Sequence, residues 1–148
     1  HRRYFRVLKL TERVDTLADH AQRFIPKLLA QQRAGEALDA WVSCVKRKPD
    51  FKLDSAQFSY ELAQQAWKAG KPRYVLILAK EFEKRFAGSS LIPSMLELVV
   101  RAYKQGLEQP MQGVHVYMQM KQRFPGHAST KEAEWVLRDE LEELGTTP

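Results

Sequence analysis

Three similar stretches recur along the chain at a constant interval, and this period limits the folds that the sequence can adopt. The stretches are CVKRKPDF (44–51), FEKRFAGS (82–89) and MKQRFPGH (120–127), which lie 38 residues apart. A fixed period of about 20 to 50 residues is typical of proteins built from stacked structural repeats. The interval aligns Arg47 with Arg85 and Arg123, Trp41 with Ala79 and Tyr117, and Leu38 with Leu76 and Val114.

The spacing of apolar residues predicts that the repeated unit is a helical hairpin. Apolar side chains recur at intervals of three and four residues along most of the chain, which is the pattern of helices with one buried face. The sequence predicts seven helices, joined by short loops, and no strands. We expect these helices from near Thr11 through Leu29, at 35–48, from the end of KLDS to Gly70, and at 72–86, 92–106, 111–124 and 130–144.

Several residues predict where these helices bend, begin or end. Pro26 lies inside the first pattern and predicts a kink or a break there. Pro49 is expected to end the second helix, and Gly70 to end the third in a left-handed conformation. Pro93 suits the first turn of the fifth helix. Either Ser129 or Thr130 is expected to cap the last helix.

A single hairpin of this size buries only one side against its neighbour, so the units are expected to fold together. Burial of one large apolar side chain contributes roughly 1.5–3 kcal/mol. We expect this energy to concentrate at Trp41, Phe82 and Met120.

The repeating residues resemble the tetratricopeptide repeat, in which a small residue precedes a large apolar residue by four positions and a Pro closes the unit. Ala37, Trp41 and Pro49 match this pattern; the other two units supply Val75, Ala79 and Ala87, and Gly113, Tyr117 and Pro125. The resemblance covers 11–144 and departs from the family in its period, near 38 and not 34, and at Val75. It implies an all-α, right-handed superhelical array of antiparallel helix hairpins. The closings RFPGH and RFAGS resemble bacterial cell-envelope versions of the repeat, which suggests a bacterial source.

Two further stretches resemble each other, AWKAGK at 66–71 and AYKQGL at 102–107, and this pair is called the echo below. It supplies the candidate binding site. In the family that the chain resembles, first helices line a concave groove that holds a partner's peptide. The spacing places Tyr60, Gln64, Trp67 and Lys68 on one helix face, and Tyr103 and Lys104 occupy the matching places one unit later. Aromatic and basic side chains often dominate binding energy. The alternative is that Trp67 and Tyr103 point into the core while Lys68 and Lys104 are solvated.

Charge is distributed unevenly along the chain, whose formal net charge is +6. The segment 1–10 has four basic residues and no acid, whereas 131–148 has six acids and two basic residues. A basic body could attract anionic partners, and Arg47, Arg85 and Arg123 form a candidate basic surface. The alternative is a solvated surface with surplus cations. We expect the acidic helix 130–144 to cap the array.

The segment 1–10, HRRYFRVLKL, supports two interpretations. Lys and Arg are enriched just cytoplasmic of transmembrane helices, so a longer protein could be tethered to the inner membrane there, with this domain in the cytoplasm. The segment is also typical of an ordinary basic amino-terminal helix. Because the chain begins with His, we expect a fragment of a longer protein. Residues 11–148 are expected to form a single helical repeat domain.

The residue types that carry chemistry do not form recognisable constellations. The four His residues lie at 1, 20, 115 and 127 without metal-ligand spacing, and the seven Gly residues form no phosphate-binding loop. Cys44 reads as a small core residue, since no local Cys-His signature accompanies it. We therefore expect no enzyme activity, no cofactor and no metal site.

The sequence favours a non-enzymatic scaffold that binds a peptide or protein partner in a helical groove. A nucleic-acid-binding repeat protein is the second interpretation, although no nucleic-acid motif is present. A helical enzyme is the third. The identity of the partner and the oligomeric state do not follow from the sequence.

Overall fold

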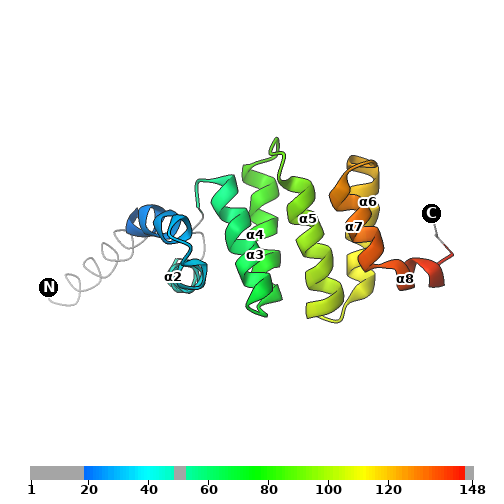
Figure 1. The fold of residues 1–148 in the computed structure, drawn as a ribbon, viewed down its shortest axis with the longest axis horizontal. Coiled ribbons are helices and arrows are strands. Elements are labelled where there is room, and N and C mark those ends of the chain that lie inside the picture. Colours follow the sequence, from blue (N-terminus) through cyan, green and yellow to red (C-terminus); the bar gives the residue numbers. More distant parts are fainter. Residues whose placement is uncertain (1–18, 49–52, 146–148) are drawn as a thin grey trace, which may run out of the picture. The chain divides into compact units, whose positions relative to one another are not determined.

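The computed structural model describes residues 19–48 and 53–145, and within these ranges it consists of helices joined by short turns, with no strand. A helix covers 19–30 (Figure 1). It is followed by α2 (Ala34–Arg47), α3 (Ala56–Lys68), α4 (Pro72–Arg85), α5 (Ile92–Arg101), the π-helix η1 (Ala102–Gly106), α6 (Pro110–Arg123), α7 (Ala128–Val136) and α8 (Arg138–Glu143). The predicted all-α class is confirmed for the described residues.

The boundaries differ from the expected ones at three places. The helix 19–30 continues through Pro26, so the chain does not break there, and the alternative of a kink stays a prediction. Proline removes one helical hydrogen bond, and buried Ile25 and Leu28 lie on either side of it. The expected last helix is divided at Leu137 into α7 and α8, and the expected fifth helix ends in the π-helix η1. The expectations for 1–10, Thr11 and Pro49 lie outside the described residues.

Three helices of the same length begin at a constant interval. α2, α4 and α6 each have 14 residues and begin at Ala34, Pro72 and Pro110, which are 38 residues apart. The residue before each helix has a similar conformation, with φ between −104° and −123° and ψ between 53° and 66°. The residue after each helix donates its backbone N–H to the carbonyl of Cys44, Phe82 or Met120. The sequence period therefore appears in the backbone as a recurring local geometry.

The turns that precede these helices also share one left-handed residue at the same interval. Gln32, Gly70 and Glu108 have φ values of 59°, 72° and 53°. In the first two turns the next N–H reaches back five residues, from Arg33 to Leu28 O at 2.8 Å and from Lys71 to Ala66 O at 2.9 Å. This is the bond of a Schellman motif, which ends a helix where one residue turns left-handed. The prediction for Gly70 is confirmed.

The chain divides into two compact units, 1–62 and 63–148. In the described part of the first unit, the buried residues follow one face of each helix. They are Ala21, Ile25, Leu28 and Leu29 in the helix 19–30, Ala37, Leu38, Trp41 and Cys44 in α2, and Ser59 and Leu62 in the part of α3 that belongs to this unit. The start of α3 is capped by Ser55, whose Oγ accepts the Phe58 N–H at 3.3 Å.

Helix α5 is the central element of the second unit. It packs against α4, α6 and α7 (Figure 1). Seven of its ten residues are buried, and Met95 and Val100 are fully enclosed. Pro93 lies in its first turn, as predicted. Trp41, Phe82 and Met120, at which we expected burial energy to concentrate, are all buried.

The acidic end of the chain is held to α5 and η1 by ion pairs. Glu132 of α7 lies 3.6 Å from Arg101, and Glu140 of α8 lies 2.7 Å from the Lys104 ammonium. The cap of α7 is His127, whose Nδ1 accepts the Ser129 N–H at 3.0 Å. The expectation of a Ser129 or Thr130 cap is therefore wrong. Both are buried, and the Thr130 hydroxyl donates to Phe124 O at 2.7 Å.

The left-handed conformation of Gly70 predicts the effect of a side chain there. A residue with a Cβ loses about 1–2 kcal/mol in this conformation. We expect Gly70→Ala to lower the free energy of unfolding by about 1 kcal/mol, measured by urea denaturation followed by circular dichroism. Gly126→Ala is the control, because nothing lies within 4 Å of its added Cβ and its φ is not left-handed. Equal effects of the two substitutions would contradict this explanation.

Candidate partner-binding groove

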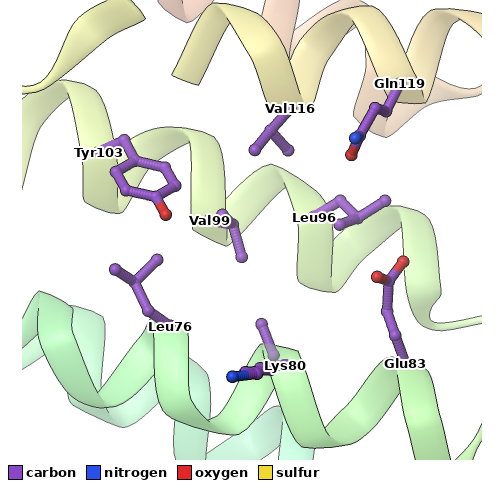
Figure 2. A pocket seen from close by; sticks show the side chains of 9 residues that line it. Leu76, Lys80, Glu83, Leu96, Val99, Tyr103, Val116 and Gln119 are labelled. Carbon is purple, nitrogen blue, oxygen red and sulfur yellow. The ribbon is translucent and has the colours of Figure 1, made fainter. Parts of the chain in front are cut away.

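A groove of about 300 Å³ opens on the second unit, over α5 and between α4 and α6 (Figure 2). Its floor contains the buried side chains of Ala79, Leu96 and Val99. Half-buried Leu76, Tyr103 and Val116 form its apolar walls. Lys80, Glu83 and Gln119 complete the lining. Apolar surface that is open to solvent is thus surrounded by a few polar groups, as in ordinary binding sites.

Helical spacing explains which side chains reach the groove. Leu96, Val99 and Tyr103 are three and four residues apart, so they share one face of α5 and η1. The run from Val75 to Ala79 in α4 is apolar at five consecutive positions. Val75, Leu78 and Ala79 are buried, whereas Leu76 remains half-exposed in the wall of the groove.

The two ends of the groove differ in polarity. At one end, Glu83 accepts a charge-assisted hydrogen bond from Arg123 at 2.6 Å, which links α4 to α6. At the other end, the Tyr103 ring carries its hydroxyl into the groove (Figure 2). Lys80 lies on the α4 side and is exposed. The groove therefore offers a phenol and an ammonium beside an apolar floor.

The six candidate residues, Tyr60, Gln64, Trp67, Lys68, Tyr103 and Lys104, have different surroundings in the structure. Tyr103 lines the groove, and the other five are absent from its lining. Lys104 is paired with Glu140, so a carboxylate of the chain itself already neutralises this cation. Lys68 is exposed. Tyr60 and Gln64 are half-buried, and Tyr60 belongs to the first unit.

The two halves of the echo have different backbones. Trp67 lies near the end of α3, before left-handed Gly70, whereas Ala102–Gly106 is π-helical. The third left-handed residue is Glu108, so Gly106 is not the counterpart of Gly70. A Cβ added to Gly106 would lie 2.6 Å from the Pro72 Cβ and 3.5 Å from the Trp67 ring. Gly106 thus allows close packing of η1 against Pro72 and Trp67.

The candidate basic surface consists of the final residues of three helices. Arg47, Arg85 and Arg123 end α2, α4 and α6, and all three are exposed. The Arg85 and Arg123 guanidinium groups lie over the rings of Phe86 and Phe124, at 5.6 and 5.1 Å. Because Arg123 also pairs with Glu83, part of its charge is used within the chain.

Other chemistry is limited in the part of the chain that the structure describes. No group of three His, Cys, Asp or Glu side chains is placed to hold a metal ion in 19–48 and 53–145. Within the same ranges, no helix has the length and apolar character needed to cross a membrane. Cys44 is buried, as expected of a core residue, and burial raises the pKa of its thiol while Arg47 opposes this shift.

The sequence predicted a binding groove that includes Tyr103, but it did not predict the rest of this lining, although one signal pointed to it. Five consecutive apolar residues in α4 exceed what one buried helix face requires. The two excess residues are Leu76, which lines the wall of the groove, and Ile77, whose side chain is 43% exposed. The 38-residue interval aligns Leu76 with Leu38 and Val114, which are buried, whereas Leu76 is half-exposed.

Comparisons with known proteins give no relative for this chain. Its sequence matches no protein-family model and no curated protein, and its structure matches no solved structure.

The close approach at Gly106 predicts a packing defect upon substitution. Overpacking typically costs about 1–3 kcal/mol, and the rigid ring of Pro72 has little freedom to move. We expect Gly106→Ala to lower the free energy of unfolding within this range, as measured by urea denaturation. Gly88→Ala should be nearly neutral, because nothing lies within 4 Å of its Cβ. A neutral Gly106→Ala would show that the contact is absent.

The raised pKa of Cys44 predicts an inert thiol and a specific alkaline effect. The native thiol should react with an aromatic disulfide reagent about 100-fold more slowly than the urea-unfolded chain, because thiolate is scarce and buried. As pH rises above about 9, the unfolded thiol ionises before the folded one, so the free energy of unfolding should fall. Cys44→Ala should lack this component of the pH dependence. Equal reaction rates in the native and unfolded states would contradict the prediction.

Proposed function

We propose that this chain is a non-enzymatic scaffold that binds a peptide or a protein segment in the groove between α4 and α6. The observation that carries the proposal is the open apolar groove, whose floor and walls come from three helices that pack together. Groups on well-packed helices hold a binding surface with little loss of entropy on binding. The groove lacks the paired acids, bases or nucleophiles that catalysis needs, since its lining contains one Lys, one Glu and one Tyr as ionisable residues.

The recurring backbone geometry supports a tetratricopeptide-like repeat as the architecture of this scaffold. Helices α2, α4 and α6 share their length, their interval and the conformation of their flanking residues. The left-handed turn before each one recurs at the same place. Arrays of such hairpins create extended surfaces that commonly bind other proteins.

The nucleic-acid alternative is less well supported by the same geometry. Arg123 is paired with Glu83, and Glu140 neutralises Lys104. Nucleic-acid binding depends on cations that remain available to phosphates. The apolar groove has no function in that alternative, whereas it is the central feature of a peptide-binding protein.

The test is binding of a peptide selected from a random display library on the wild-type protein. The double variant Leu76→Gln, Val116→Gln makes both apolar walls polar at half-exposed positions, so the fold should be kept. We expect its Kd, measured by calorimetry, to be weaker by about tenfold or more, because apolar anchors dominate such interfaces.

Ile77→Gln is the matched control. It is also an apolar residue of α4 and is 43% exposed, but it is not part of the groove lining. Its Kd should stay close to that of the wild type. If the double variant binds every selected peptide as tightly as the wild type while its circular dichroism is unchanged, the groove is not the binding site.

A further inference from the structure

We propose that the groove accepts an acidic segment of another protein, with a bulky apolar side chain on the floor and carboxylates beside Lys80. This inference rests on the proposed peptide-binding function and adds the chemical class of the partner. It follows from the balance of paired and unpaired charges around the groove.

The acidic residue of the groove lining is already neutralised. Glu83 is bonded to Arg123 at 2.6 Å. Within α5, Glu97 is bonded to Arg101 at 3.2 Å. Helix α6, which forms the opposite wall, contains Lys121 and Arg123 and no acidic residue. A ligand in the groove therefore meets little free negative charge from these side chains.

Three cations of α4, unlike these acidic residues, form no ion pair within the described residues. Arg73, Lys80 and Lys84 are exposed, and the structure shows no hydrogen bond or ion pair for their side chains within the described residues. They are seven and four residues apart, so they lie along one face of the helix. Lys80 also lines the groove itself. This row of cations is complementary to a segment that carries carboxylates.

The size of the groove limits what its apolar part can hold. Pockets for whole small molecules usually have volumes of about 300–1,000 Å³. The groove, with about 300 Å³, is at the lower end of this range and remains open to solvent. It suits one or two apolar side chains of a longer segment. The phenol of Tyr103 can donate a hydrogen bond to the backbone of that segment.

Charge also argues against the chain's own first residues as the occupant. The segment 1–10 contains the apolar residues Tyr4, Phe5, Val7 and Leu8, but it has four cations and no acid. Like charges placed together reduce affinity. An acidic segment from another protein avoids this repulsion, because the same cations attract its carboxylates.

The experiment compares three fluorescent helical peptides with identical Leu and Phe positions, whose remaining positions carry Glu, Gln or Lys. Fluorescence anisotropy with the full chain gives each Kd. We expect the Glu peptide to bind at least about tenfold more tightly than the Gln peptide and the Lys peptide to bind weakest. Raising salt from about 50 to 200 mM should reduce this difference.

Two charge variants locate the effect. Lys80→Glu should weaken the Glu peptide by about tenfold and leave the Gln peptide nearly unchanged. Lys131→Glu is the matched control, because it makes the same change of net charge at an exposed position of α7 outside the groove lining. Its effect on either peptide should be small. Circular dichroism of both variants checks that the fold is retained.

Three other outcomes would overturn the inference, and each would identify a different part of it as wrong. If the Glu and Gln peptides bind equally and only the Leu76→Gln, Val116→Gln variant weakens them, the groove binds segments but does not select acidic ones. If no peptide responds to that double variant, the groove function fails as well. If Lys80→Glu and Lys131→Glu weaken a labelled oligonucleotide equally, while the peptides do not bind, the cations serve nucleic acid instead.

Discussion

The packing of α5 against α4, α6 and α7 is the interaction on which the rest of the second unit depends. Met95 and Val100 of α5 are fully buried, and Leu96 and Val99 of the same helix form part of the groove floor. A helix that is apolar on most of its circumference is normally enclosed on all sides. Here α4 and α6 lie on either side of α5, and part of that apolar surface remains accessible between them (Figure 2). Stability and the candidate binding site thus come from the same helix.

Ion pairs and close contacts then fix the elements that surround this helix. Arg123 and Glu83 join the ends of α6 and α4, while Arg101 and Lys104 hold the acidic helices α7 and α8. Partly exposed pairs of this kind contribute only about 0–1 kcal/mol each. Their main effect is on charge: Arg123 neutralises Glu83 at the groove, while the side chains of Arg73, Lys80 and Lys84 form no ion pair within the described residues. The acidic residues Glu132 and Glu140 therefore act as internal counterions for Arg101 and Lys104.

The helices were predictable because their signals are local. Apolar residues at intervals of three and four, with Gly70 and Pro93 near helix ends, define each helix through interactions within a few residues. The cap of α7 was mispredicted because preferences favour Ser and Thr, whereas the His127 ring reaches the same N–H. The π-helix η1 was missed because AYKQG has nearly the same letters as AWKAG. The segment AYKQG differs from AWKAG because it packs against Pro72 and Trp67 at Gly106. This contact joins residues that are distant in the sequence, so a short stretch does not reveal it.

The sequence by itself determined the helical class, the interval of 38 residues and the left-handed turn at Gly70, because these depend on neighbours along the chain. The tertiary structure alone decided which apolar side chains stay open to solvent and which cations are paired. Leu76 has the same local pattern as a core residue, yet it lines a groove. Lys104 looked like Lys68 in its local sequence, but it meets Glu140, which is 36 residues away. Packing between segments that are distant in the sequence determines this exposure and this pairing, so no short stretch of sequence predicts them.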